Sequence, residues 1–481
     1  MKSTLLTNWK MGCAMLLLCA TAIASHAQVF TTLANFHGPN GKEPWGVLVQ
    51  GPDGNFYGTT FYGGEFGDGT VYRITPAGKL RRLYSFCGQA NCADGENPSA
   101  GLALATDGNF YGTTYAGGAY TAGTVFKITP KGILSTLYSF CSQPRCTDGA
   151  NPPVAVLVQA TDGNFYGTTC CGGAYGQGTV FKITPSGTLT TVYSFCPQGY
   201  PCVDGTGPDS LTQATDGNFY GTTGDGGTYI GDCITYGCGT VFEITPSGTL
   251  TTLADFDVSN GYVPVGLTQG IRGNFNGATL EGGQNGAGTV FGITPEGSLT
   301  TLYSFCALAD CSDGSGPAGG LVQDINGNFY GTTRYGGELG YGTVYELLTA
   351  AGVLTTLHSF DGADGGSPYA GLLQATNGTF YGTTVGGGTS IDGTVFSLST
   401  GLGPFVAFVR AAGKVGQTGG ILGQGFTGTT TVSLNGTPAT FTVVSDTYIK
   451  ATVPVGATSG YVTVTTPTGT LTSNVPFQVI P

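Results

Sequence analysis

The sequence repeats one eight-residue phrase at a nearly constant interval, and this repeat constrains the fold more than any other feature. Consecutive copies begin between 51 and 56 residues apart. Self-similarity at such a period is typical of propellers, solenoids and other repeat arrays. The phrase Asp-Gly-Asn-Phe-Tyr-Gly-Thr-Thr and its degenerate versions begin at Asp53, Asp107, Asp162, Asp216, Arg272, Asn326 and Asn377.

Each repeat contains four short runs that resemble strands and are separated by turn signals. In the third repeat the runs are residues 155–159, 164–169, 178–184 and 189–195. An Asp-Gly turn joins the first run to the second, and a Pro-x-Gly turn joins the third to the fourth. Short connections between consecutive strands imply antiparallel meanders. Four-stranded antiparallel units repeated radially are the blades of a β-propeller.

The fourth type of run follows every repeat except the last. The six copies end at Phe86, Phe140, Phe195, Phe256, Phe305 and Phe360. The missing copy is residues 29–36 at the front of the chain, and the last repeat stops after residues 393–398. We therefore expect an all-β fold in which residues 28–400 form a seven-bladed β-propeller, with the N-terminal strand closing the last blade. Closure removes exposed sheet edges, whereas an open solenoid would need polar caps.

The same phrases resemble the GloVer tandem repeat family of bacterial secreted proteins. The resemblance rests on Gly-Leu-Val-Gln, Asp-Gly-Asn-Phe-Tyr-Gly-Thr and Gly-Thr-Val-Phe-Lys-Ile-Thr-Pro, and it covers residues 29–400. It implies a repeat fold in an exported protein, and it implies no particular activity.

Residues 401–481 differ from the repeat and are rich in Thr, Val and Gly. They contain seven short strand-like runs, a pattern typical of a β-sandwich. Residues 423–426, 434–439 and 445–454 resemble an IPT/TIG domain. The resemblance implies an immunoglobulin-like sandwich that serves as a spacer or adhesive module.

The N-terminus, residues 1–27, is typical of a secretory signal peptide. Two lysines precede a largely apolar stretch, which ends in a cleavage site of the small-x-small type. We therefore expect a secreted, extracellular protein that starts at Gln28. A lipoprotein signal ending at Cys19 is the alternative, although Leu18 is larger than the residue such signals need before the cysteine. No other stretch is long and apolar enough to span a bilayer.

The charge pattern narrows the class of partner. The formal net charge is -12, only 9% of the residues are charged, and no Lys/Arg run occurs. This disfavours nucleic acid and anionic lipid as partners. We expect a monomer whose partner is a glycan or a cell-surface protein.

Twelve cysteines remain beyond the signal peptide, an even number in an exported chain. Four of the loops after the fourth run contain two cysteines each and the others contain none, so we expect the two to be disulfide partners. The expected disulfides are Cys87–Cys92, Cys141–Cys146, Cys196–Cys202, Cys233–Cys238 and Cys306–Cys311. Cys170 and Cys171 could form a vicinal disulfide or remain two free thiols. Zinc is not expected, since histidine is nearly absent.

We find no catalytic motif, and we expect neither a cofactor nor a metal. Asp residues in the repeated Asp-Gly turns suit the backbone of those turns. The Asp-Gly pairs after the cysteines could bind calcium, but turn capping explains them better. His358 replaces a repeated Tyr and is expected to be structural. A glutamine recurs near the end of the first run, either lining a channel or bonding neighbouring blades: Gln50, Gln159, Gln213, Gln269, Gln323 and Gln374, with Leu104 in the remaining repeat.

The loops between the second and third runs vary most, and function concentrates on loops displayed by a rigid scaffold. Together with the connections between blades they form the face that we expect to bind a ligand. Their tyrosines suit stacking on sugars or a protein interface, although they could simply pack on neighbouring loops. The candidates are Tyr62, Tyr115, Tyr120, Tyr175, Tyr229, Tyr236, Tyr335 and Tyr341.

These features predict a non-catalytic binding or adhesion protein. The alternative is a carbohydrate-active enzyme on a propeller, a lyase or a glycosidase. A glycosidase needs two carboxylates that flank a cleft. Candidates are Glu65, Asp68, Asp225, Asp232, Glu281 and Glu338.

Overall fold

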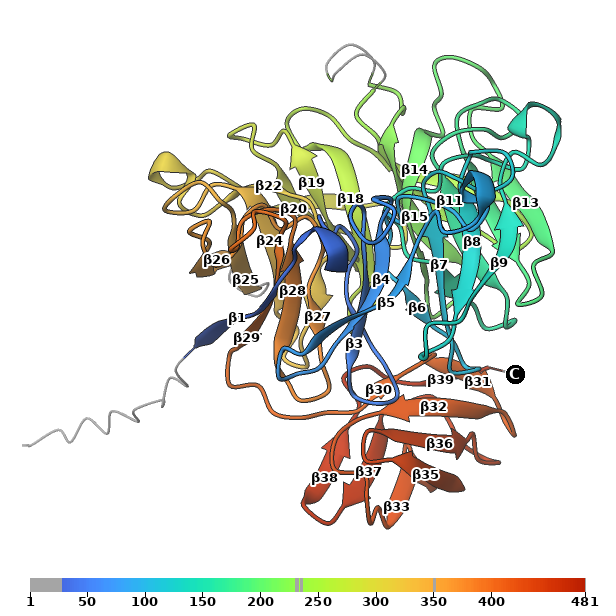
Figure 1. Cartoon of the computed structure of the whole chain (residues 1–481), viewed down its shortest axis with the longest axis vertical. Coiled ribbons are helices and arrows are strands. Elements are labelled where there is room, and N and C mark those ends of the chain that lie inside the picture. The colour runs from blue at the N-terminus through green and yellow to red at the C-terminus, as the bar shows by residue number, and fades with distance from the viewer. Residues whose placement is uncertain (1–27, 230–232, 234–236, 349–351, 481) are drawn as a thin grey trace, which may run out of the picture.

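The computed structural model describes residues 28–229, 233, 237–348 and 352–480, and the regular secondary structure of this part of the chain is almost entirely β-strand. The predicted signal peptide (residues 1–27), Asp232 and Tyr236 lie outside the described residues. Each repeat corresponds to one antiparallel sheet, which has four strands except in the sixth repeat, where it has five, and the sheets are numbered here in chain order (Figure 1). No helix in the described part has the length and apolarity required to cross a membrane.

The first four sheets follow the repeat directly. Sheet 1 contains β2 (Val49–Gln50), β3 (Phe56–Thr60), β4 (Thr70–Ile74) and β5 (Leu80–Ser85). Sheet 2 contains β6 (Ala103–Leu104), β7 (Phe110–Thr114), β8 (Thr124–Ile128) and β9 (Leu134–Ser139). Sheet 3 contains β10 (Val158–Gln159), β11 (Phe165–Thr169), β12 (Thr179–Ile183) and β13 (Leu189–Ser194). Sheet 4 contains β14 (Thr206–Gln213), β15 (Phe219–Asp225), β16 (Thr240–Ile244) and β17 (Leu250–Asp255).

The remaining repeat sheets keep the same order, and the last one takes its outer strand from the N-terminus. Sheet 5 contains β18 (Tyr262–Gln269), β19 (Phe275–Glu281), β20 (Thr289–Ile293) and β21 (Leu299–Ser304). Sheet 6 contains β22 (Ser315–Pro317), β23 (Val322–Gln323), β24 (Phe329–Tyr335), β25 (Thr343–Leu348) and β26 (Val353–Ser359). Sheet 7 contains β27 (Leu373–Gln374), β28 (Phe380–Thr384), β29 (Thr394–Ser399) and β1 (Val29–Asn35).

The repeated Phe-Tyr pair holds neighbouring sheets together. Side chains alternate along a strand, so Phe56 and Tyr57 of β3 point to opposite faces, and both are buried. Tyr57 packs on Phe110 of sheet 2 with ring centroids 4.2 Å apart. The same contact recurs between later sheets as Tyr111–Phe165, Tyr166–Phe219, Tyr220–Phe275 and Tyr330–Phe380. Each sheet therefore needs a partner on both faces.

The N-terminal strand completes sheet 7, as the sequence predicts. Strand β1 pairs antiparallel with β29, with Val29 opposite Ser399 and Ala34 opposite Val395. Sheet 7 then packs on sheet 1, because Tyr381 lies 4.1 Å from Phe56 between ring centroids. The first and last repeats are thus neighbours in space.

The recurring glutamines hydrogen-bond across adjacent sheets. Oε1 of Gln159 accepts the backbone N–H of Thr106 in the preceding sheet at 2.9 Å. Gln213, Gln269, Gln323 and Gln50 repeat this bond to Thr161, Thr215, Ile271 and Thr376. Leu104 stands where the preceding sheet offers Pro52, which has no N–H to donate. The hypothesis of bonding between sheets is therefore supported over channel lining.

These glutamines give a matched pair of stability predictions. Gln50 is buried and bonds both the N–H and the hydroxyl of Thr376. Gln374 is also buried, but its Oε1 has no partner. Gln50→Leu should lower the free energy of unfolding by about 1–3 kcal/mol, since it orphans a buried donor. Gln374→Leu should change it by less than about 0.5 kcal/mol or raise it. Urea unfolding followed by circular dichroism checks this, and equal losses would contradict the role of the bond.

The C-terminal region, residues 401–480, forms further antiparallel sheets. One sheet has the order β30 (Ala407–Phe408), β32 (Thr418–Leu422), β36 (Tyr448–Thr452) and β35 (Phe441–Ser445). Another has the order β34 (Thr437–Pro438), β33 (Thr431–Leu434), β37 (Val462–Thr466) and β38 (Gly469–Thr472). Strands β31 (Ala412–Lys414) and β39 (Gln478–Ile480) pair in parallel. A shared core of Val406, Ile421, Phe426, Ile449 and Val464 joins the two larger sheets.

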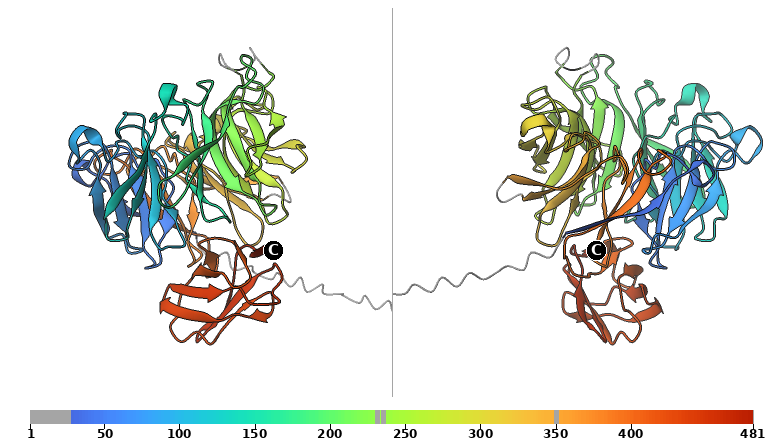
Figure 2. Two further views of the ribbon diagram at one scale, coloured as in Figure 1. Left: turned by 90° about the vertical axis from the view of Figure 1, so that its right-hand side faces the viewer. Right: turned by 60° about the vertical axis from the view of Figure 1, so that its left-hand side comes forward.

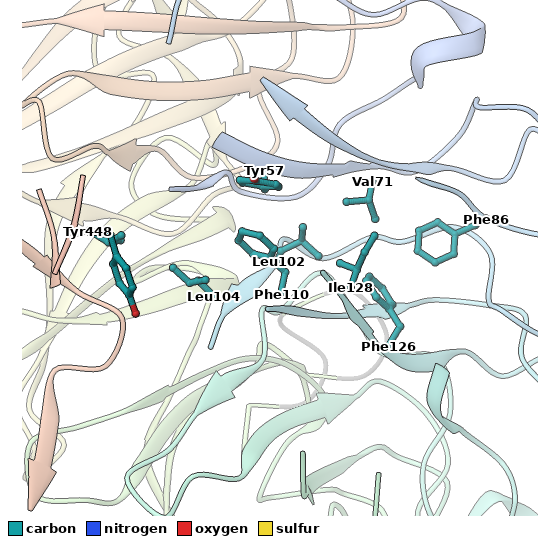
Figure 3. Packing of buried hydrophobic residues seen from close by; sticks show 10 residues of the cluster. Tyr57, Val71, Phe86, Leu102, Leu104, Phe110, Phe126, Ile128 and Tyr448 are labelled. Atoms are coloured by element: carbon teal, nitrogen blue, oxygen red, sulfur yellow. The ribbon is translucent and has the colours of Figure 1, made fainter. Parts of the chain in front are cut away.

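This region lies against the end of the repeat sheets that carries the short turns (Figures 1 and 2). The hydroxyls of Ser445 and Thr447 donate to the carbonyl of Pro52. Tyr448 and Leu422 join the buried cluster that contains Leu104, and Figure 3 shows Tyr448 beside Leu104. Leu104, which replaces the recurring glutamine, therefore packs against apolar side chains of the C-terminal region.

Four 3-10 helices lie in the connections between sheets: η1 (Gly38–Asn40), η2 (Ala90–Cys92), η3 (Pro144–Cys146) and η4 (Ala309–Cys311). All five predicted disulfides are present. In the first of these loops the buried carboxylate of Asp94 accepts the Tyr84 hydroxyl at 2.7 Å and the N–H groups of Gly88 and Gln89. Asp148, Asp204 and Asp313 bond in the same manner. These aspartates therefore cap their loops.

His358 and the turn aspartates have structural partners. Nε2 of His358 lies 2.7 Å from the carboxylate of Asp364. In other repeats a tyrosine hydroxyl donates to an aspartate at the same place. The imidazole ring of His358 also stacks on Phe30. Asp53 accepts the Tyr57 hydroxyl at 2.9 Å and the backbone N–H of Asn55. Asp107, Asp162 and Asp216 repeat this turn. The carboxylates of these four turn aspartates thus accept hydrogen bonds from groups in their own turns and strands.

Candidate functional site

The loops between the second and third strands meet the connections between sheets at one end of the repeat region. Backbone bridges join the two kinds of loop, for example Lys42 with Tyr62 and Ala150 with Cys171. The C-terminal region contacts the short turns at the opposite end. The variable loops are therefore left uncovered by the C-terminal region.

The described candidate tyrosines are all exposed. Tyr62 packs edge-on against Phe61, and Tyr335 lies under the guanidinium of Arg334. Tyr115 is close enough to Cys170 and Cys171 for their charge to raise its pKa, after the larger effect of burial. These three tyrosines thus lie at or just after the end of a second strand, and we call them the inner tyrosines.

The other described tyrosines lie apart from that group. The side chains of Tyr120 and Tyr175 lie near those of Tyr138 and Tyr193 on the outer strands β9 and β13. The ring of Tyr341 packs on Gly362 and Gly366, in the connection between sheets 6 and 7. The carbonyl of Tyr229 faces the Cys238 sulfur. The structure therefore divides the predicted set into an inner and an outer group.

An aromatic stack lies where the inner loops meet. Trp45 stacks on Phe61 with ring centroids 4.3 Å apart and on Tyr369 at 5.2 Å. Trp45 comes just before the first strand of sheet 1, and Tyr369 holds the same position before sheet 7. Gly46 and Gly101 come just before the first strands of sheets 1 and 2, and their backbones lie so close together that a Cβ on Gly46 would touch Gly101. Neighbouring sheets therefore converge at their first strands, which are the innermost. The stack is thus near the centre of the repeat region.

A cation and a carboxylate accompany the aromatic stack. The Arg334 guanidinium lies 4.8 Å from the ring centroid of Tyr369, and its buried Nε has no hydrogen-bond partner. The charges of Arg334 and Asp209 both act on Tyr369, whose pKa is raised above all by burial. Asp209 belongs to sheet 4 and Tyr369 precedes sheet 7. We call Trp45, Phe61, Asp209, Arg334 and Tyr369 the inner cluster.

Burial raises the pKa of Asp209 to about 6. The side chain is only partly accessible, and no opposite charge offsets the cost of removing its carboxylate from water. A carboxyl that titrates near neutral pH can accept or donate a hydrogen bond to a ligand hydroxyl.

This shift predicts a pH-dependent stability difference. A carboxyl whose folded pKa exceeds its unfolded value destabilises the fold above that folded pKa, and the cost declines as pH falls from the folded to the unfolded pKa. Asp209→Asn should therefore raise the free energy of unfolding by about 1–3 kcal/mol at pH 7.5 and by almost nothing at pH 3. Urea unfolding at the two pH values checks this, and a pH-independent difference would contradict it.

Sequence reasoning did not select any of the five members of the inner cluster as a ligand-binding candidate, although a signal was present. Trp45, Asp209 and Tyr369 each follow a proline that stands five or six residues before the recurring glutamine, and other repeats place Ser99, Pro153, Val265 and Ala318 after the corresponding proline. Phe61 and Arg334 each follow the repeated Thr-Thr. The residues on both sides of these positions are nearly the same in every repeat, whereas the residue type at these positions changes from repeat to repeat. This variation indicates that the packing of the sheets does not fix the side chain there.

Two of the predicted carboxylates, Glu65 and Glu281, have structural partners. Glu65 pairs with Arg82 at 3.6 Å, and Glu281 accepts the Tyr262 hydroxyl. Asp68 lies near Glu96, whose pKa is raised first by burial and then by Asp68. These two carboxylates flank the Cys87–Cys92 disulfide, whose sulfurs are not available as thiolate ligands. The group therefore does not make a thiolate metal site.

Burial also raises the pKa of Asp225. Glu338 lies in the loop before β25, where its backbone N–H bonds Ser359. These two candidates come from sheets 4 and 6. No hydrogen bond that the structure records for the described residues joins them.

Comparison with known sequences gives one family. A model described as the Gloeobacter/Verrucomicrobia repeat matches residues 21–234 and 208–444. No curated protein matches the chain by sequence.

Several solved structures resemble the chain in fold. An extracellular domain described as part of a hybrid two-component system of B. thetaiotaomicron aligns with a TM-score of 0.51 and 11% identity, over 94% of this chain and 57% of that chain. An extracellular domain of a one-component system from the same organism gives 0.50 and 12%, over 95% and 58%. A fungal alcohol oxidase of the AA5 family, in complex with copper, gives 0.52 and 13%, over 94% and 99%. At such low identity these likenesses concern the fold alone.

Proposed function

Because the chain belongs to the Gloeobacter/Verrucomicrobia repeat family, we propose that it is an exported binding protein without catalytic activity. In this proposal residues 1–27 are a signal peptide, residues 28–400 form a seven-bladed β-propeller, and residues 401–481 form an immunoglobulin-like β-sandwich of the IPT/TIG type. The antiparallel sheets and the packing of sheet 7 on sheet 1 support the propeller. Five disulfides support an oxidising, extracellular location.

The ligand is a glycan, and the inner cluster is its binding site. The observation that carries this is the Trp45–Tyr369 stack beside an Arg334 Nε that is buried without a partner. Aromatic faces pack on the apolar faces of sugar rings, while Arg and Asp side chains bond their hydroxyls. A buried donor left unpaired costs free energy, and a ligand hydroxyl or carboxylate would satisfy it.

The inner tyrosines extend this site. Tyr62 and Tyr335 are exposed next to Phe61 and Arg334 of the inner cluster, and Tyr115 is exposed at the corresponding end of sheet 2; all three offer further stacking surfaces to a longer chain of sugars. The C-terminal region occupies the opposite end, where it serves as a spacer. The extracellular domains of sensor proteins among the similar structures fit a binding role.

A carbohydrate-active enzyme is the second candidate. Its support is the closeness of Asp68 and Glu96, whose oxygens lie within 4.8 Å of each other. Two carboxylates about 5–5.5 Å apart suit a retaining glycosidase. These carboxylates, however, flank a disulfide, and no side-chain contact that the structure records for the described residues joins them to the aromatic stack. The binding role is therefore favoured.

A glycan array and a hydrolysis screen on the same purified chain separate the two functions. Retention of a glycan without release of shorter products supports binding. Release of products that stops in Asp68→Asn and Glu96→Gln would establish the enzyme instead. Failure to retain any glycan, with retention of a surface protein, would replace the glycan by a protein ligand.

A further inference from the structure

Cys170 and Cys171 are adjacent thiols directly after β11, and they are the unpaired cysteines of the described chain. Their sulfurs lie 2.9 Å apart. The other ten described cysteines form the five disulfides. This pair therefore stands out in a protein whose remaining thiols are oxidised.

The two thiols differ in exposure. Cys171 is exposed, whereas Cys170 is partly buried and is acted on by the charge of Asp209. The contact with Cys170 lowers the pKa of Cys171 to about 7, while the contact with Cys171 and burial raise the pKa of Cys170. An accessible thiolate beside a protected thiol is the arrangement of a nucleophile and its resolving partner.

The backbone holds the two thiols in place. Cys171 exchanges two hydrogen bonds with Ala150, and the N–H of Cys170 donates to Asn151. A disulfide between adjacent residues closes a small ring that contains the planar peptide bond joining them, whereas the five loop disulfides close rings through several residues. A disulfide between them is therefore strained, and strained disulfides are readily reduced.

We propose that Cys170 and Cys171 form a redox-active dithiol that exchanges with low-molecular-weight disulfides. The Cys171 thiolate attacks one sulfur of R–S–S–R, whose S–S bond breaks, and RS⁻ leaves and takes up a proton. Cys170 then loses its proton to solvent and attacks Sγ of Cys171, which releases the second RSH. Two electrons pass from the protein to the small disulfide, and the product is a vicinal disulfide. This step is independent of glycan binding.

Glutathione redox buffers test the proposal on the purified chain. After equilibration, acid quenching and alkylation, mass spectrometry of the peptide that contains both residues counts alkylated thiols. We expect two alkyl groups in reduced glutathione, and none in oxidised glutathione, where the peptide has lost two hydrogens. The change should reverse, while the five loop disulfides stay paired. Two alkyl groups in every buffer, or two bound glutathiones, would overturn the proposal.

Two serine variants assign the roles. Cys170→Ser should accumulate one glutathione on Cys171, because the resolving thiol is absent. Cys171→Ser should acquire glutathione on Cys170 at least about tenfold more slowly, since that thiol is protected and seldom ionised. Equal rates would refute the assigned order of attack. Thermal melting of both variants checks that they are folded. This control excludes unfolding as the cause of a changed reaction rate.

Discussion

Phe36→Ala is expected to lower the free energy of unfolding by about 3–5 kcal/mol, the usual cost of truncating a fully buried Phe. Phe36 has no exposed surface and follows directly on β1. It belongs to one buried cluster with Tyr72 of sheet 1 and Val395 of sheet 7, and its N–H donates to Gly393. The substitution therefore weakens the contact that joins the two ends of the repeat region. Urea unfolding followed by circular dichroism measures the loss.

Val29→Ala is the matched control for Phe36→Ala. Val29 lies at the other end of the same N-terminal strand and is 54% exposed. Its truncation should change the free energy of unfolding by less than about 0.5 kcal/mol. If both variants unfolded at the same urea concentration as the unsubstituted chain, the N-terminal strand would not be holding sheet 7 against sheet 1.

Trp45→Ala with Tyr369→Ala is expected to weaken glycan binding about a hundredfold, and each single substitution about tenfold. The two rings form the stack on which the sugar is proposed to lie. Isothermal titration calorimetry with a soluble form of the best-retained array glycan measures the dissociation constants. Trp45→Phe keeps a flat ring and should retain most of the affinity.

Tyr120→Ala provides the control on the outer rim. Tyr120 is as exposed as the inner tyrosines but lies near Tyr138 on the outer strand β9. Its loss should change the dissociation constant less than about twofold, as expected for a residue outside the contact. A large loss in Tyr120→Ala, with full affinity in Trp45→Ala, would move the binding site to the outer loops.

Much of the fold could be predicted because the same strand pattern recurs in every repeat, so that each type of strand can be recognised from several copies. The absence of a fourth run after residue 398 and its presence at residues 29–36 predicted the pairing of β1 with β29, which the structure confirms. The paired cysteines likewise predicted the disulfides. The docking of Tyr448 beside Leu104 could not be predicted, since a contact between the two regions leaves no periodic trace in either.

The candidate site was predicted less completely for the same reason. Exposed tyrosines were selected by loop and residue type, and this selection could not separate Tyr62 near the inner cluster from Tyr175 on the outer rim. Asp209 and Arg334 come from different sheets, and their closeness to Tyr369 depends on how the sheets surround the centre. Sequence gives the positions at which the repeats diverge, but the structure is needed to see that these positions meet.

Tryptophan fluorescence offers the most direct test of the proposed site, because Trp45 is the one tryptophan of residues 28–481. Titration with the best-retained glycan should shift or quench its emission saturably, with the same dissociation constant as calorimetry gives. The response should disappear at the same concentrations in Tyr369→Ala. A glycan that binds tightly by calorimetry while the emission of Trp45 stays constant would contradict the assignment of the inner cluster as the binding site.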